Sequence, residues 1–373
     1  MPVTPTAISH PLLSDTRLAI LDGGLGTTLE TTFGLDISNT PLWSAKAAIE
    51  HPETIVDAHL AFLRAGAEII LTATYQSSLE TYRKAGYTDD EAAALVKKCV
   101  GLAAEARRRF RQERPSQNPK IALSLGPYGA GLSPAQEFDG YYPPPYGPRG
   151  YTVDGRNINS FAEGEAEDEQ LAIQALAEYH FSRLQLAADD PDVDLIAFET
   201  VPLLREVRAI RMAMGRLATD KPWWVSFVFP DGKFPNTLRP DADERVAIHD
   251  IIAATFGDAS TENPCPAAIG INCTPLHALP HIVAEMEAAL RLRGEALKPF
   301  LVLYPNAGDV YDPASQTWIV KSGEREREVW AEQLRGLVLE TLDRPGSVWA
   351  GVVVGGCCRT GPQDISLLSS LLH

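Results

Sequence analysis

The sequence has no long apolar run. None of its 373 residues lies in a stretch that approaches the roughly 18 apolar residues of a membrane-spanning helix. The first residues, MPVTPTAISHPLL, lack the charged start and apolar centre of a signal peptide. Cysteine is scarce, and its five residues are too unevenly placed for a disulfide scaffold. These absences predict a cytoplasmic protein that does not contact a membrane.

Basic residues are fewer than acidic residues. The chain has 33 Lys and Arg residues against 49 Asp and Glu residues, a formal net charge of −16. Such a chain repels phosphate backbones, which argues against nucleic acid as a partner. A cationic small molecule would be tolerated or favoured. The alternative is that the charge only keeps the protein soluble.

A dinucleotide-binding motif is missing after the first apolar run, where Gly23, Gly24 and Gly26 do not match G-x-G-x-x-G. Apolar runs typical of buried strands cover 18–22, 69–75, 121–125, 195–198, 223–229, 268–272, 300–304 and 348–354. Helical patterns follow them at 49–65, 89–114, 165–188, 203–217, 243–256, 277–293, 324–342 and 362–372. Strict alternation predicts parallel βαβ units, and eight of them favour a (β/α)₈ barrel of TIM type over an open doubly wound sheet.

The chain shows no internal repeat, and we expect residues 1–373 to form one barrel domain. The exception to the alternation is a long irregular segment at about 128–160, rich in Gly, Pro and Tyr. A loop of that length within a compact domain is usually functional or disordered, and its tyrosines favour packing. A lid over the barrel mouth and a surface elaboration are both compatible with the pattern.

Three cysteines follow apolar runs. Cys357 and Cys358 come directly after Gly355-Gly356, and Cys273 ends the run at 268–272. Neighbouring side chains of a strand face opposite sides, so both thiols reach one point only if the strand ends before them. Three thiolates at two strand ends predict a zinc site with one open position. The alternative is that they only fill core, and an adjacent Cys-Cys is not a common zinc spacing.

Polar residues end most of the other runs. In such barrels the chemistry lies at the carboxyl ends of the strands. A single carboxylate there is often only the N-cap of the next helix, but two carboxylates and three thiols at one mouth favour a site. The residues at these ends are Asp22, Thr74, Tyr75, Gln76, Gly126, Pro127, Glu199, Thr200, Phe229, Cys273, Asn306, Cys357 and Cys358.

Seven motifs together resemble the homocysteine S-methyltransferase family. They cover nearly the whole chain, and the order of GINCT and GGCCRTGP is highly specific. The resemblance implies a (β/α)₈ barrel, a catalytic zinc and methyl transfer to L-homocysteine, giving methionine. Because no cobalamin-binding or folate-binding region is present, the likeness is to the small members. The motifs are LDGGLGT (21–27), TATYQ (72–76), SLGPYGA (124–130), FETVP (198–202), GINCT (270–274), YPNAG (304–308) and GGCCRTGP (355–362).

The resemblance also assigns roles to residues. Cys273, Cys357 and Cys358 resemble the family's zinc ligands and form the catalytic centre. Asp22 and Glu199 resemble the groups that hold the amino-acid moiety of the substrate. The other substrate-binding candidates lie in the same motifs: Gly23, Thr74, Tyr75, Asn272 and Asn306.

The expected methyl transfer depends on the deprotonated sulfur of homocysteine. Zinc would stabilise the deprotonated sulfur of homocysteine, which then attacks a methyl group on a sulfonium or ammonium donor. The donor leaves neutral, so no general acid is needed, and His277 is expected to be structural. S-methylmethionine and S-adenosylmethionine are the expected donors, ahead of betaine. Aromatic rings suit such cations, and the candidates are Trp43, Tyr75, Phe229 and the tyrosines of 128–151.

Other functions stay open at this point. A zinc-dependent barrel hydrolase would need His and carboxylate ligands, and the eight histidines do not end the apolar runs. A non-catalytic thiol- or amino-acid-binding barrel is possible on the same fold, as is a methyltransferase for another thiol or a selenol. We expect a monomer or a small homo-oligomer.

Overall fold

The computed structural model describes residues 12–37, 42, 44–240, 242–257, 259–260, 262–294, 297–308, 310–312, 317–319 and 327–373. Parallel strands form one eight-stranded sheet in the order β1-β10-β7-β6-β5-β4-β3-β2. The strands are β1 (Leu18–Ile20), β2 (Ile69–Leu71), β3 (Lys120–Leu125), β4 (Leu195–Val201), β5 (Trp223–Phe227), β6 (Ala268–Asn272), β7 (Phe300–Tyr304) and β10 (Val352–Val354).

The first two strands close the sheet into a barrel. A parallel bridge joins Leu21 to Ile69, and the Asp22 amide donates to the Ile69 carbonyl at 3.0 Å. The Glu68 amide donates to the Ile20 carbonyl at 2.7 Å. No open sheet edge is left between β1 and β2, so the predicted (β/α)₈ barrel is confirmed.

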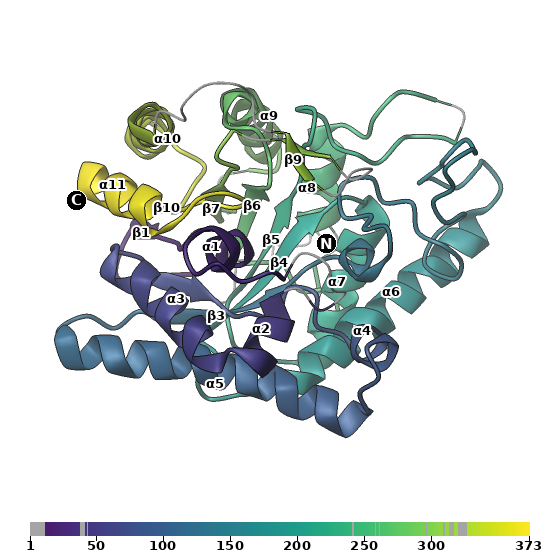
Figure 1. Ribbon diagram of the computed structural model, residues 1–373. Coiled ribbons are helices and arrows are strands. Elements are labelled where there is room, and N and C mark those ends of the chain that lie inside the picture. Colours follow the sequence, from purple (N-terminus) through teal and green to yellow (C-terminus); the bar gives the residue numbers. More distant parts are fainter. Residues whose placement is uncertain are drawn as a thin grey trace.

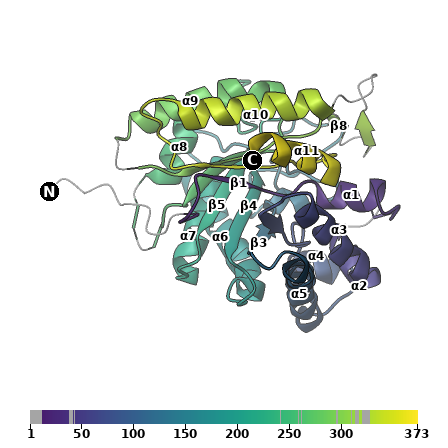
Figure 2. The same cartoon turned by 90° about the vertical axis from the view of Figure 1, so that its left-hand side faces the viewer.

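Helices surround the strands on all sides (Figures 1 and 2). Those that follow the strands are α3 (Pro52–Arg64), α5 (Asp89–Glu113), α6 (Ala166–Ala187), α7 (Leu204–Leu217), α8 (Ile248–Phe256), α9 (Leu279–Arg291), α10 (Arg327–Asp343) and α11 (Pro362–Leu372). Shorter elements are α1 (Leu25–Thr31), α2 (Ser44–Glu50), α4 (Leu79–Lys84), two 3₁₀ turns (Tyr128–Gly131 and Leu276–Ala278) and the hairpin of β8 (Val310–Asp312) and β9 (Thr317–Ile319). In the described part of the chain, no helix combines the length and the apolarity needed to span a bilayer.

Several predicted boundaries were wrong. The helix expected at 49–65 is α3, which begins at Pro52, whereas residues 49 and 50 belong to α2. The two helices break at His51 because Pro52 disfavours helical backbone in the residue before it. The helix expected from 243 starts at Ile248, since the Val246 amide pairs with the Asn236 carbonyl. The strands expected at 69–75 and 348–354 are shorter, β2 ending at Leu71 and β10 beginning at Val352.

The barrel interior is filled by every second strand residue. Leu195 and Ala197 of β4 belong to the inner cluster, whereas Ile196 and Phe198 pack against the outer helices. The same alternation carries Glu199 to the inside at the carboxyl end of the strand. By the same alternation, the side chains of Ser124 in β3 and Tyr304 in β7 point into the barrel at its carboxyl end. The lower layers are therefore apolar and the top layer is polar.

The long segment between β3 and α6 is anchored to helices α6 and α7. The Glu206 carboxylate of α7 accepts from the Tyr128 amide at 2.7 Å and from the Tyr142 hydroxyl at 2.8 Å. It also lies 3.0 Å from Nε2 of His180, and all of these groups are buried. The ring of Tyr128 stacks on Tyr146 with a centroid distance of 3.9 Å. The predicted packing of this segment is thus confirmed for its first part.

Replacing Glu206 with alanine is expected to lower the free energy of unfolding by about 3 kcal/mol or more. The change leaves the His180 ring, the Tyr142 hydroxyl and the Tyr128 amide buried without their acceptor. Urea denaturation followed by circular dichroism measures the loss. Glu178→Ala is the matched control, because Glu178 makes an exposed ion pair with Arg216 that contributes no more than about 1 kcal/mol. Equal losses in the two variants would contradict the anchoring role of Glu206.

Candidate metal centre

Three thiols meet at the carboxyl end of the barrel. Cys273 follows β6, and Cys357 and Cys358 follow β10. Their sulfur atoms all lie within 4.8 Å of one another, with 3.8 Å between Sγ of Cys273 and Sγ of Cys358. Strand β10 ends at Val354, so the adjacent cysteines lie in a loop, where neighbouring side chains can face one point.

The backbone at Cys273 is strained. Its φ of 48° lies in the left-handed region, which costs a residue with a Cβ roughly 1–2 kcal/mol. Hydrogen bonds on both sides hold this conformation: the Thr274 hydroxyl donates to the Asn272 carbonyl at 2.9 Å and accepts from the Phe229 amide at 2.9 Å. The turn directs the Cys273 thiol to the mouth directly after a strand.

The loop of Cys357 and Cys358 is tied to the two neighbouring strands. The Gly356 amide donates to the Asp22 carbonyl at 3.0 Å, and the Cys357 amide donates to the Pro305 carbonyl at 2.9 Å. The Thr360 hydroxyl donates to the Cys357 carbonyl at 2.6 Å. A Cβ at Gly23 would lie 2.5 Å from the Thr360 carbonyl oxygen, so only glycine fits there. Gly23, a substrate-binding candidate, therefore brings the first strand close to the cysteine loop.

The electrostatics of the cluster fit a cation. Hydrogen bonds from Cys273 and Cys358 hold the pKa of the Cys357 thiol well below its ordinary value. The pKa of Cys273 is raised by the thiols beside it and by burial. A positive charge among the sulfurs would favour the thiolate form of all three. Three soft ligands with no fourth His, Asp or Glu ligand in the described residues fit a metal ion that keeps one open position.

Asp22 lies beside the thiols at the end of β1 and is fully buried. Its Oδ2 accepts from the Leu71 amide at 2.8 Å, and its Oδ1 is buried without a hydrogen-bond partner. Burial raises the pKa of Asp22 well above its ordinary value, and the charges of Glu199 and Cys357 raise it further. Oδ1 is therefore an acceptor that a ligand can use.

Glu199 reaches the same space from β4. Its Oε1 accepts a short hydrogen bond from the Ser124 hydroxyl, and Tyr304 is a second partner. Burial raises the pKa of Glu199 to about 8, opposed by the Ser124 hydrogen bond and reinforced by Cys357. A cation that binds next to this carboxylate would favour its ionised form.

Asn272 and Tyr75 are connected through Thr200. The side-chain amide of Asn272 makes two hydrogen bonds to Thr200. Oδ1 of Asn272 accepts from the main-chain amide of Thr200, and Nδ2 of Asn272 donates to the Thr200 hydroxyl, each at 2.7 Å. Nδ2 also lies 3.9 Å from Sγ of Cys357. The Tyr75 hydroxyl bonds to the Thr200 side chain, and the charge of Cys273 acts on Tyr75. The structure places both candidates beside the thiols.

Thr74 and Asn306 are engaged mainly with the barrel. The Thr74 hydroxyl donates to the Ser124 carbonyl at 2.8 Å and pairs with the Thr72 hydroxyl at 2.6 Å. The main-chain amide of Asn306 donates to the Thr274 carbonyl at 3.1 Å, and the side-chain Oδ1 of Asn306 is buried without a hydrogen-bond partner. Asn306 thus offers one free acceptor, whereas the hydroxyl of Thr74 orders the ends of β2 and β3.

Two further residues belong to the site and were not selected from the sequence. Ser124 and Tyr304 both contact Glu199, and Tyr304 also accepts from Nε1 of Trp224 at 3.3 Å. Ser124 lies in the motif SLGPYGA and Tyr304 in YPNAG. Each is a polar residue at an inward-facing position of an otherwise apolar strand, and this position is the sequence signal that could have identified it.

The aromatic candidates divide into groups. Tyr75 lies at the site, and the Phe229 side chain is buried. Tyr128, Tyr142 and Tyr146 cluster with Tyr179 of α6 on the outside of the barrel, so they are not available to a ligand at the thiols. Trp43 lies outside the described residues.

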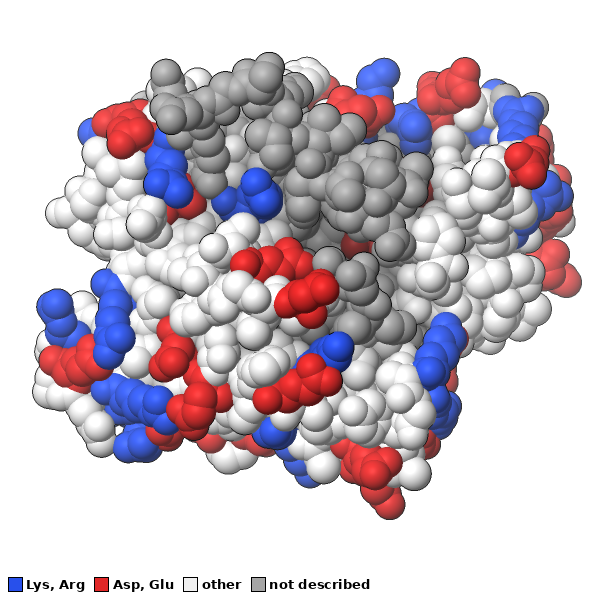
Figure 3. Space-filling model, in the orientation of Figure 1, with Lys and Arg blue, Asp and Glu red and all other residues white. Residues whose placement is uncertain are grey.

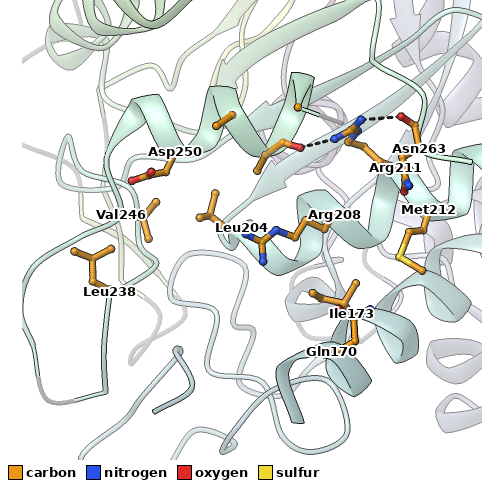
Figure 4. Close-up of a pocket in the computed structure, with 13 residues that line it drawn as sticks. Gln170, Ile173, Leu204, Arg208, Arg211, Met212, Leu238, Val246, Asp250 and Asn263 are labelled. Carbon is orange, nitrogen blue, oxygen red and sulfur yellow. Dashed lines mark hydrogen bonds between the residues drawn. The ribbon is translucent and has the colours of Figure 1, made fainter. Parts of the chain in front are cut away.

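A separate hollow of about 570 Å³ lies between helices α6, α7 and α8 (Figure 4). The Arg211 guanidinium donates to the Ala254 and Asn263 carbonyls beside it. None of the residues that line this hollow is a candidate from the sequence. They are Gln170, Ile173, Leu204, Arg208, Arg211, Met212, Leu238, Val246, Asp250, Ala253, Ala254, Gly257 and Asn263.

Comparison with known proteins gives consistent matches. A family model described as homocysteine S-methyltransferase matches residues 19–372. Homocysteine S-methyltransferase YbgG of Bacillus subtilis is 34% identical, with 97% of this chain and 96% of that protein covered. The selenocysteine methyltransferase of Astragalus bisulcatus is 32% identical, with 98% and 97% covered.

Solved structures match as well. The metallated form of the homocysteine methyltransferase MmuM from Escherichia coli superposes with a TM-score of 0.65 at 27% identity, covering 95% of this chain and 96% of that one. The metallated state of this neighbour and the cluster of three thiols here both point to a bound metal.

Proposed function

Because the chain belongs to the homocysteine S-methyltransferase family, we propose that it transfers a methyl group from a sulfonium donor to the thiol of L-homocysteine, giving methionine. The observation that carries the proposal is the meeting of three sulfur atoms within 4.8 Å at the barrel mouth, beside two buried carboxylates. A methyl-transfer assay with homocysteine and a panel of donors tests it. Absence of any methionine product would reject it.

We propose zinc as the metal and Cys273, Cys357 and Cys358 as its ligands. Thiolates are soft ligands, and a three-cysteine set with an open position is typical of catalytic rather than structural zinc. When bound, zinc would supply the positive charge that keeps the sulfur of homocysteine deprotonated near neutral pH. Because the three thiols need reducing conditions, we also propose a cytoplasmic location.

The chain's own residues would bind and orient homocysteine. Asp22 and Glu199 are proposed to accept hydrogen bonds from its ammonium group. Each carboxylate is buried and forms no ion pair with a basic side chain of the described residues, although the charge of Arg183 reaches Glu199. Ser124 and Tyr304 hold Glu199 in place. Asn272, fixed by Thr200, orients the Cys357 thiol. Tyr75, Gly23, Thr74 and Asn306 complete the pocket wall.

No residue is required as a general acid. The bond between the methyl carbon and the donor sulfur breaks with its electrons left on that sulfur, so the donor departs as a neutral sulfide. We propose S-methylmethionine or S-adenosylmethionine as the donor. A selenol acceptor is a second candidate, favoured by the likeness to the selenocysteine methyltransferase. Competition between homocysteine and selenocysteine in one assay measures the preference.

Homocysteine is expected to bind as the thiolate and to release its proton. A free thiol has a pKa of roughly 8.5, so nearly all homocysteine thiols are still protonated at pH 7. Binding should therefore release at least about one proton per homocysteine. Calorimetry in two buffers of different ionisation enthalpy measures it. Glu199, with a pKa of about 8, is itself mostly protonated at pH 7 and is unsuited to accept the proton.

Glu199→Gln serves as the control for this count. The variant removes the proton that Glu199 itself would lose when an ammonium group binds, so its count should be lower than the native count. The protons that remain come from the thiol and from Asp22, whose pKa is also raised, and should number at least about one. A count of zero, with metal and homocysteine bound, would reject the thiolate as the bound form.

A further inference from the structure

One more carboxylate enters the site, and it comes from the long segment between β3 and α6. Oε2 of Glu137 is shielded from solvent and has no hydrogen-bond partner. The charge of Glu137 reaches the Tyr75 hydroxyl and the Cys358 thiol, both of which lie at the mouth of the barrel. None of the sequence motifs includes this residue.

The backbone around Glu137 is fixed. The Gln136 amide donates to the Gly129 carbonyl at 2.9 Å, and the Gly140 amide donates to the Gln136 carbonyl at 2.9 Å. A Cβ at Gly129 would lie 2.6 Å from Gln136 backbone atoms, so the two turns are in close contact. Nε2 of Gln76, which follows β2, donates to the Ala130 carbonyl at 3.3 Å. The segment therefore holds Glu137 next to the strand end that carries Tyr75.

Glu137 is a third carboxylate at the mouth. Asp22 and Glu199 interact with Cys357, whereas Glu137 interacts with Cys358 and, like Glu199, with Tyr75. Two cationic substrates must meet at one sulfur, so each needs its own contacts there. Asp22 and Glu199 are the carboxylates proposed for the homocysteine ammonium, which leaves Glu137 for the donor.

Among the described residues, no basic side chain forms an ion pair with Glu137. The guanidinium of Arg183 donates to the carbonyls of Ser77, Gly126 and Tyr75. On the face seen in Figure 3, acidic and basic side chains are interspersed. A carboxylate oxygen that is shielded from solvent without a partner is costly, and a ligand of positive charge reduces that cost.

We propose that Glu137 binds the sulfonium group of the methyl donor and sets the preference for cationic over neutral donors. This inference rests on the proposed function of the same site. The positive charge is present in the bound donor and absent from the sulfide that leaves, so a carboxylate beside it binds the donor and not the product. Glu137 thereby strengthens donor binding and favours product release.

The test is steady-state kinetics of Glu137→Gln with the donor that the native protein uses. We expect the KM of the donor to rise about tenfold to a hundredfold, because a charged contact is lost, while kcat stays within about threefold. The KM of homocysteine and the zinc content should not change. Glu137→Asp keeps the charge at a shorter reach, and its donor KM should lie between the two.

Methyl iodide separates a charge effect from a structural one, since it is a neutral donor to the same bound thiolate. Its rate should be equal in native protein and Glu137→Gln. Asp154→Asn is the matched control, because Asp154 lies on the same segment but is exposed to solvent, and its donor KM should be native. An unchanged donor KM in Glu137→Gln, or an equal loss with methyl iodide, would overturn the inference.

The same experiments distinguish this inference from the proposed function. If native protein transfers no methyl group from any sulfonium donor to homocysteine, the proposed function fails. If native protein is active and Glu137→Gln has the native donor KM, only the role of Glu137 fails.

Discussion

Alanine in place of Cys273, Cys357 or Cys358 is expected to remove most of the zinc and to lower the rate of methyl transfer at least about a thousandfold. Zinc sites supply several kcal/mol of charge stabilisation, and about 1.4 kcal/mol corresponds to tenfold in rate. The three sulfurs lie within 4.8 Å of one another, so losing one leaves an incomplete ligand set. Metal analysis after dialysis and the methyl-transfer assay measure the two losses.

Cys99 and Cys265 are the internal controls. Cys99 is buried in α5 and belongs to a separate apolar cluster with Ile55 and Ala58, and Cys265 lies in the loop before β6. Cys99→Ala should cost about 1 kcal/mol of stability through the lost packing, yet both variants should keep one zinc per chain. Full activity in metal-free protein would end the zinc proposal.

Asp22→Asn and Glu199→Gln are expected to weaken homocysteine binding about tenfold to a hundredfold while zinc is retained. Each change removes the charge of an acceptor for the substrate ammonium, a contact of roughly 1.5–3 kcal/mol. The amide can still accept from the Leu71 amide in the first variant and from Ser124 in the second, so the fold should persist. Loss of zinc instead would make these residues supports of the metal.

The dependence on pH gives a second measurement. Only the ionised carboxylate pairs with an ammonium group, and the pKa of Glu199 is raised to about 8 in the empty site. Below pH 8, Glu199 must lose its proton before it can pair with the ammonium group. The affinity for homocysteine should therefore rise by up to about tenfold per pH unit because of Glu199 alone. In Glu199→Gln that part of the slope should vanish. Asp57→Asn, on the exposed face of α3, should keep the native slope.

The fold was predictable because its signals are local. Each buried strand is an apolar run, and the helices between them carry amphipathic patterns, so alternation alone indicates the barrel. The errors also have local causes. Pro52 ends α2, and the pairing of 236 with 246 delays α8, but the apolar pattern continues through both positions. Short helices such as α1 and α4 carry too few residues for a periodic signal.

The site was predictable only in part. Strand ends indicated Cys273, Asp22 and Glu199, because the carboxyl ends of parallel strands meet at one edge. Glu137 had no such signal, since a long irregular segment has no register that places its residues. The left-handed turn at Cys273 is likewise not encoded by a glycine. Such turns are set by the surrounding hydrogen bonds, which only the folded chain contains.

The pairing of β1 with β10 has a consequence for synthesis on the ribosome. Leu18 to Ile20 pair with Val352 to Val354, so one side of the first strand has no partner until the last strand emerges. At about 5–20 residues per second, that wait is on the order of tens of seconds. Two of the three thiols arrive with the same late segment. The nascent chain thus completes its barrel and its metal ligands in one step, and an interrupted chain should have neither.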